Sequence, residues 1–91
     1  MTIRVRFFAY FRELFGAREI ALDLPAGSRV GTALDRLADT PARRSELFDG
    51  DRLKPHLVLM VNGAGLPPGE GLDAPLAEGD VLAVFPMMGG G

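Results

Sequence analysis

The sequence has no cysteine and no tryptophan, and it has a single histidine, His56. Without cysteine, the chain can form no disulfide, no thiolate metal site and no side-chain persulfide. One histidine is too few for a multi-histidine metal site or a catalytic triad of ordinary composition. We therefore expect a protein that is not an enzyme by itself and that holds no metal and no bound cofactor.

Strong charge of either sign is also lacking. Ten Lys and Arg residues against twelve Asp and Glu residues give a net charge of −2, which lacks the basic footprint of a nucleic-acid-binding protein. No apolar run approaches the roughly 18 residues of a membrane span. The N-terminus carries charges where a signal peptide needs an apolar stretch. We expect a soluble cytoplasmic protein that has neither nucleic acid nor a membrane as partner.

What the chain does contain is the patterning of one small domain. It has 91 residues, of which 47% are hydrophobic. Residues 3–9 alternate in the manner of a strand with one buried face, formed by Ile3, Val5 and Phe7. Phe8 is the anomaly, because it shares the opposite face with arginines.

The remaining patterns predict an α+β roll in which one mixed sheet wraps one amphipathic helix. They indicate a short helix at 10–15, a strand at 19–24, a longer helix at 30–38 capped by Ser28, a strand at 57–61, a minor strand, and a final strand at 81–85. We expect residues 42–56 to be irregular with Leu47 and Phe48 as anchors, residues 57–61 to be buried on both faces, and residues 63–71 to lack regular structure.

The last eleven residues carry no charged side chain. Proline cannot extend a central ladder, so strand pairing should stop at Phe85, before Pro86. Two methionines and three glycines follow, which predicts a thin, uncharged segment ending in a carboxylate. Such a segment suits a mechanism in which the α-carboxylate is activated by adenylation in a partner's active site. The alternative is a frayed terminus whose glycines do nothing.

A contact surface is predicted at Phe8, Leu66 and Phe85. If the first and last strands pair side by side, Phe8 lies near Phe85, directly before the terminal segment. An aromatic pair rimmed by arginines is typical of a protein interface. The alternative is that both rings belong to the core, because strand-face assignments slip easily.

The chain resembles the ubiquitin-like sulfur carriers of the β-grasp fold, and among them the small subunit of molybdopterin synthase. The resemblance spans essentially the whole chain and rests on segments that occur in order: Val5–Ala9 with Phe11–Gly16, Val61–Gly63, and Leu76–Val81 leading into Phe85–Gly91. It implies a β-grasp domain at 1–86, with a mixed sheet of four to five strands packed on one main helix, and a flexible Gly-rich tail at 87–91.

The resemblance also implies a thiocarboxylate cycle. An E1-like enzyme would adenylate the carboxylate of Gly91 with MgATP, and sulfur would then replace AMP. The large catalytic subunit of molybdopterin synthase would receive the tail and the sulfur. Gly90 and Gly91 match the family's Gly-Gly end. The positions that would bind partners are Phe8, Leu66, Phe85, Pro86, Met87, Met88 and Gly89.

The tail departs from the family at Met87, Met88 and Gly89, where a second proline, a β-branched residue and a small residue are usual. Methionine suits adaptable apolar grooves, so the departure bears on the partner more than on the chemistry. Other functions therefore stay open. The sulfur acceptor could belong to tRNA thiolation, thiamine biosynthesis or cysteine biosynthesis. Gly91 could instead be joined to lysines of other proteins, or the chain could be a plain interaction domain with an inert tail.

Overall fold

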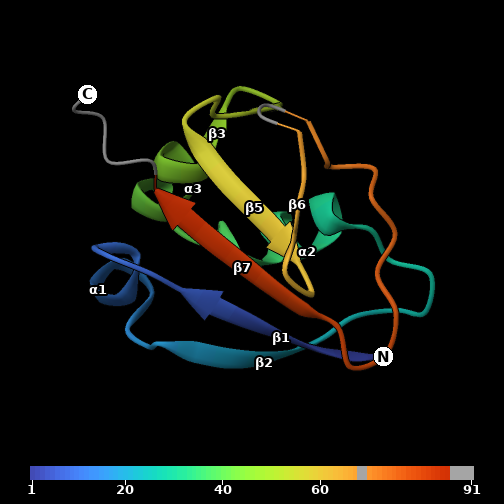
Figure 1. Cartoon of the computed structure of the whole chain (residues 1–91). Coiled ribbons are helices and arrows are strands. Elements are labelled where there is room, and N and C mark those ends of the chain that lie inside the picture. Colours follow the sequence, from blue (N-terminus) through green and yellow to red (C-terminus); the bar gives the residue numbers. More distant parts are fainter. Residues whose placement is uncertain (68–69, 87–91) are drawn as a thin grey trace.

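The computed structural model describes residues 1–67 and 70–86 and is built around one five-stranded sheet (Figure 1). Across the sheet the strands run in the order β2-β1-β7-β5-β6. Their bounds are Thr2–Phe7 for β1, Glu19–Asp23 for β2, Leu57–Val61 for β5, Ala64–Gly65 for β6 and Val81–Pro86 for β7. β1 pairs in parallel with β7 at the centre, and the other pairings are antiparallel. This is the mixed sheet of the β-grasp roll.

The helices are α1 (Phe11–Phe15), α2 (Val30–Leu37) and α3 (Pro41–Leu47). Figure 1 shows α2 and α3 behind the sheet and α1 at the end where β1 finishes. The short helix predicted at 10–15 is confirmed. Gly16 ends α1 with a φ of 72°, a left-handed conformation that favours glycine, and its amide donates to the Arg12 carbonyl.

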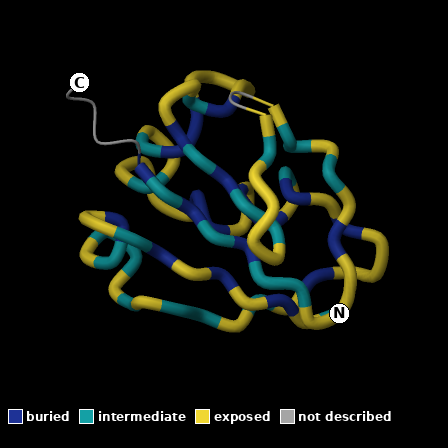
Figure 2. The backbone as a smooth tube through the Cα atoms, in the orientation of Figure 1, coloured by how far each residue is buried: buried dark blue, intermediate teal, exposed yellow. Residues whose placement is uncertain are grey.

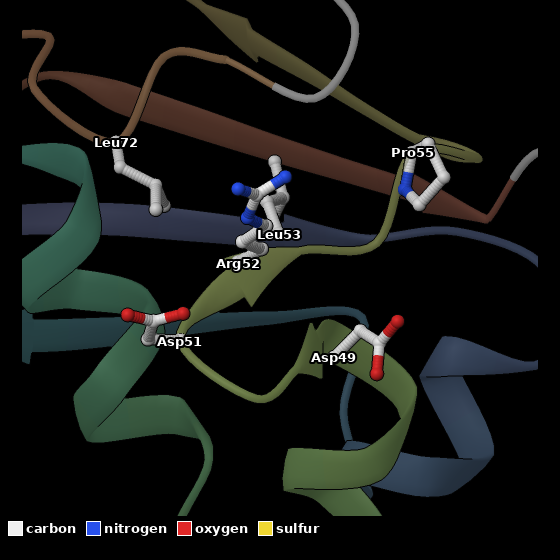
Figure 3. A pocket seen from close by; sticks show the side chains of 6 residues that line it. All are labelled: Asp49, Asp51, Arg52, Leu53, Pro55 and Leu72. Carbon is white, nitrogen blue, oxygen red and sulfur yellow. The ribbon is translucent and has the colours of Figure 1, made fainter.

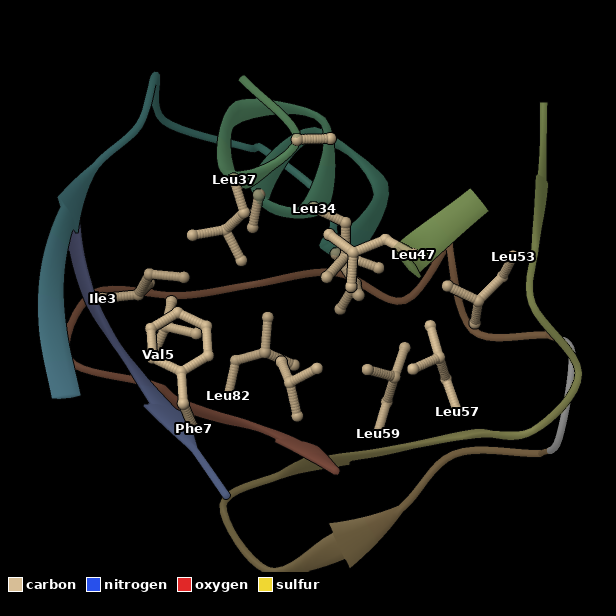
Figure 4. Packing of buried hydrophobic residues seen from close by; sticks show 14 of the residues in the cluster. Ile3, Val5, Phe7, Leu34, Leu37, Leu47, Leu53, Leu57, Leu59 and Leu82 are labelled. Atoms are coloured by element: carbon tan, nitrogen blue, oxygen red, sulfur yellow. The ribbon is translucent and has the colours of Figure 1, made fainter. Parts of the chain in front are cut away.

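The core lies between the sheet and α2. Ile3, Val5 and Phe7 of β1 are buried, as the alternating pattern predicts, and the alternation is visible along the strands in Figure 2. Figure 4 shows Leu34 and Leu37 of α2 reaching toward these side chains. The amphipathic helix therefore closes one face of the sheet, which we call the inner face.

Two expectations about the helices are wrong. Ser28 does not cap α2; the N-cap is Arg29, and the Ser28 hydroxyl donates to the Pro25 carbonyl at 2.7 Å. Residues 42–56 are not irregular, because most of the first half is α3. Thr40 begins that helix by accepting a hydrogen bond from the Arg43 amide at 3.1 Å, with Pro41 in the first turn.

The rest of that region is a two-stranded hairpin, β3 (Phe48–Asp49) with β4 (Arg52–Leu53). Gly50 turns the chain between them with a φ of 67°. Leu47 and Phe48 are buried, as predicted for anchors. Local charge hid both elements, because an exposed short helix and a two-residue strand need few apolar positions.

β5 is buried on one face only, which corrects a second group of expectations. Leu57 and Leu59 are each 2% exposed, whereas Val58 and Met60 are partly exposed on the other side. β6 occupies part of the range 63–71, which was expected to lack regular structure. Asn62 and Gly63 form the turn with φ values of 51° and 83°, so this hairpin matches its sequence signal.

Pairing along β7 runs one residue further than predicted. Pro86 pairs with Leu57 of β5 and is buried. On the other side, the ladder with β1 already ends at Phe7 and Val84. Pro86 is therefore tolerated because it has a strand neighbour on one side only. In the described part of the chain, no helix is both long and apolar enough to cross a membrane.

Candidate functional site

The sheet face turned away from α2 carries a second apolar surface. Because side chains alternate along strands, Ala83 and Phe85 point away from the buried Leu82 and Val84. The register sets Val58 opposite Phe85 and Met60 opposite Ala83. We call the surface made by these partly exposed residues the outer apolar face: Phe8, Val58, Met60, Val81, Ala83 and Phe85. The viewer of Figure 1 looks onto this side of the sheet.

Phe8 and Phe85 form one end of the outer apolar face, where β1 and β7 finish. Their rings stack with centroids 4.1 Å apart and an interplanar angle of 10°. The parallel ladder places Phe7 beside Val84, so the next residues of each strand meet. The prediction that the two phenylalanines lie together is confirmed, and the alternative that both are core residues is wrong, since both are partly exposed.

The turn after Phe8 brings Arg12 of α1 over the Phe8 ring. Ala9 takes a φ of 54°, which ends the strand and starts the chain toward α1. Arg12 then donates from Nε to the Phe7 carbonyl at 3.1 Å. Its guanidinium carbon lies 5.5 Å from the centroid of the Phe8 ring, within the range of a cation–π contact. Phe8 therefore contacts both Arg12 and Phe85.

Two other arginines flank the outer apolar face, and both are ion-paired to one carboxylate. Arg4 and Arg6 bind the Glu19 carboxylate of the neighbouring strand at 2.7 and 2.9 Å. Hydrogen bonds from Arg4 and then Arg6 lower the pKa of Glu19. The arginine rim that the sequence predicts is present, but at this edge it is an ion-pair network on the sheet rather than a set of free charges.

Leu66 does not join the outer apolar face. Its amide donates to the carbonyl of the buried Leu59 at 2.9 Å, and its half-buried side chain packs against the core. Gly71 approaches so closely that a Cβ there would lie 2.8 Å from a Leu66 methyl. The structure thus brings together Phe8 and Phe85 and leaves Leu66 on the inner side. A partner-binding role for Leu66 stays a prediction.

Sequence reasoning missed Val58 and Met60. The run at 57–61 is apolar at every position, so its composition hides which residues face the core. The cross-strand register supplies this information. The signal that could have identified Val58 and Met60 is the continuous apolar run itself, since a strand paired with that of Phe85 presents alternate residues on the face of Phe85. Pro86 is described and buried. Met87, Met88, Gly89, Gly90 and Gly91 lie outside the described residues.

A separate hollow of about 500 Å³ lies over the β3–β4 hairpin (Figure 3). Its lining consists of Asp49, Asp51, Arg52, Leu53, Pro55 and Leu72. Within residues 1–67 and 70–86, no three metal-ligating side chains gather anywhere. None of the residues around the hollow belongs to the outer apolar face, so it is not part of the candidate site.

Comparison with known proteins finds a family and relatives that match over the length of the chain. The model of the ThiS family matches residues 5–91. Small archaeal modifier protein 3 of Haloferax volcanii is 33% identical over the full length of both chains. Among solved structures, small archaeal modifier protein 1 of Haloferax volcanii covers all of both chains at 29% identity with a TM-score of 0.83.

A third similar protein is described as a putative molybdopterin converting factor, subunit 1, from Pyrococcus furiosus. It is 30% identical with a TM-score of 0.73, and the match covers 94% of this chain and 97% of that one. The three likenesses extend over nearly the whole chain, and the fold of the solved structures is the ubiquitin-like β-grasp.

Proposed function

Because the chain belongs to the ThiS family of ubiquitin-like sulfur carriers and modifiers, we propose that its working group is the carboxylate of Gly91. The folded domain is the part that other proteins hold. The observation that carries this proposal is the outer apolar face, whose stacked Phe8 and Phe85 lie where β7 ends and the segment 87–91 begins. A partner seated on this face is close to that segment.

The chemistry follows from the weakness of a carboxylate as an electrophile. In the proposed cycle, the Gly91 carboxylate attacks the α-phosphate of MgATP in an E1-like partner, releasing pyrophosphate and forming an acyl adenylate. A hydrosulfide ion from the sulfur donor then attacks the acyl carbon, AMP leaves, and loss of the S–H proton gives a terminal thiocarboxylate. Glycine at 89–91 suits passage through a narrow channel, because each Cβ would widen the required bore. The cycle takes place in the cytoplasm.

For the sulfur acceptor we propose the molybdopterin pathway, with this chain as the small subunit of molybdopterin synthase. The large catalytic subunit would cover the outer apolar face and take the tail into its active site. Support comes from the Pyrococcus furiosus relative, which is described as a subunit of a molybdopterin converting factor. The methionines at 87 and 88, which directly follow the buried Pro86, would occupy the entrance of that channel.

Protein modification is the second candidate. It is favoured by the Haloferax volcanii relatives, which are named modifier proteins and match at 33% and 36% identity. The adenylation step is shared, but a lysine amine of a target would take the acyl carbon and form an isopeptide bond. Carriers for tRNA thiolation, thiamine or cysteine biosynthesis would also share the first step and differ in the final acceptor.

Mass spectrometry of the protein purified from its native host tests the proposal. Intact mass and the C-terminal peptide should show one oxygen replaced by sulfur at Gly91, and the large synthase subunit should co-purify. Gly91 recovered in isopeptide bonds with foreign lysines would favour the modifier. An unmodified carboxylate after co-expression with an E1-like enzyme and a sulfur source would contradict both.

A further inference from the structure

Arg12 has hydrogen-bonding capacity that the fold does not use. Its Nε donates a hydrogen bond to the Phe7 carbonyl, and its guanidinium lies over the Phe8 ring. Within the described part of the chain, neither of its two Nη nitrogens takes part in a hydrogen bond. An arginine carries five N–H donors in a planar fork, so four remain available.

Four other arginines are ion-paired, whereas Arg36 of α2, like Arg12, donates only to a carbonyl oxygen among the described residues. What distinguishes Arg12 is its place beside the outer apolar face, over the Phe8 ring. Arg4 and Arg6 share Glu19, and Arg43 and Arg44 pair with aspartates at 2.8 and 2.6 Å. Among residues 1–67 and 70–86, no carboxylate oxygen lies within 4.0 Å of Arg12. The positive charge of Arg12 is therefore uncompensated by those residues, at the edge of the outer apolar face and next to its stacked rings.

The side chain is also held in place before any partner arrives. A free arginine loses much rotamer freedom on binding, but here the Nε bond and the ring contact already restrict it. A prepositioned guanidinium beside an apolar patch is a common anchor in protein interfaces. Its flat fork matches a carboxylate through two parallel hydrogen bonds.

We propose that Arg12 is a docking residue that receives an Asp or Glu carboxylate of the protein covering the outer apolar face. This inference rests on the proposed function, because it assumes a protein partner on that face. A guanidinium complements either a carboxylate or a phosphate, and the surroundings of Arg12 favour the carboxylate. Phe8 and a peptide carbonyl surround Arg12, without the cluster of N–H donors from which phosphate sites are usually built.

Titration calorimetry with the full chain and the purified large synthase subunit, or the E1-like enzyme, tests the proposal. No nucleotide is present, so a nucleotide phosphate cannot be the group that Arg12 binds. Arg12→Gln should weaken binding on the order of 10- to 100-fold and reduce its dependence on NaCl concentration. Arg12→Lys keeps the charge but not the planar fork, so its affinity should lie between those of Arg12→Gln and the unmodified chain. Arg36→Gln is the matched control, since Arg36 lies on α2 and donates to the Asp23 carbonyl.

Binding of Arg12→Gln equal to the unmodified chain would overturn the inference while leaving the proposed function standing. Weaker binding with an unchanged salt dependence would also overturn it, because Arg12 would then only support the Phe8 ring. Failure of the unmodified chain to bind either protein would remove the proposed function together with this inference. Circular dichroism of each variant separates these outcomes from unfolding.

Charge reversal then identifies the partner group. Arg12→Glu should abolish binding, and one Asp→Arg or Glu→Arg variant of the partner should restore it. Restoration at a single acidic position is the expected result. If no acidic position of the partner restores binding, Arg12 has no carboxylate partner and the inference is wrong.

Discussion

The two faces of the sheet are made by the same strands but lie in different environments. On the inner face, Ile3, Val5 and Phe7 are at most 1% exposed beneath α2. On the outer face, Phe8 and Phe85 stack on each other and keep part of their surface in solvent. Both faces are apolar, so hydrophobicity alone does not separate them. What separates them is coverage: the chain's own helix covers one face, and the other stays partly exposed.

Neighbouring phenylalanines give the sharpest test of this contrast. Phe7→Ala should cost about 3–5 kcal/mol of unfolding free energy, because it removes a fully buried ring from the core. Phe8→Ala should cost only about 1–2 kcal/mol, the loss of a partly exposed stacked pair. Urea unfolding of both variants measures the difference. Equal losses would show that the outer ring is also a core residue.

Charge on the outer apolar face should affect docking rather than folding. Phe85→Arg should weaken binding to the large synthase subunit by about 30-fold or more, because a desolvated anchor is replaced by a charge. Ala21→Arg adds the same charge on the same face at the β2 edge and should have little effect. Pull-down and calorimetry report both. Unchanged binding of Phe85→Arg would remove this face as the interface.

A smaller effect separates Met60 from Leu66. Met60→Ala on the outer apolar face should weaken docking by less than about tenfold. Leu66→Ala should leave docking unchanged, since its side chain packs against the core on the other side of the sheet. The same calorimetric titration compares them. Weaker docking of Leu66→Ala with normal docking of Met60→Ala would reverse the assignment of faces and restore Leu66 as a contact residue.

The smallest effect concerns the ion pairs beside the outer apolar face. Because Arg4 and Arg6 lower the pKa of Glu19 in the folded state, Glu19 contributes stability above its unfolded pKa. That contribution is lost as the pH falls through the folded-state pKa. As the pH falls through the folded-state pKa of Glu19, the unmodified chain should therefore lose slightly more unfolding free energy than the Glu19→Gln variant. Identical profiles would mean that the ion pairs add nothing measurable.

Much of this fold can be predicted from alternation and turn residues. Ile3, Val5 and Phe7 indicate their strand, and Gly16 and Asn62-Gly63 mark turns that the structure contains. The anomaly of Phe8 also predicts a surface contact, because a large aromatic residue on an arginine face is unusual in a half-buried strand, and the structure stacks it on Phe85. These signals are local, so the sequence contains them directly.

The rest depends on contacts between distant residues. Composition hides the two faces of 57–61, and only pairing with β7 shows that Met60 lies beside Ala83. Leu66 is positioned by the backbone hydrogen bond from its amide to the Leu59 carbonyl, which no local sequence pattern predicts. Arg12 looks like an ordinary helix-surface arginine until the fold sets it over Phe8. Docking sites formed across strands are thus the part that sequence patterns reveal least.

Deletion of Gly91 tests whether the C-terminal carboxylate is the reactive group. The chain lacking Gly91 should keep its fold by circular dichroism and still bind the large synthase subunit through the outer apolar face. In a reconstituted reaction with the E1-like enzyme, MgATP, a sulfur donor and the large subunit, it should transfer no sulfur. Undiminished sulfur transfer by the deleted chain would show that the reactive carbon lies elsewhere and would contradict the account.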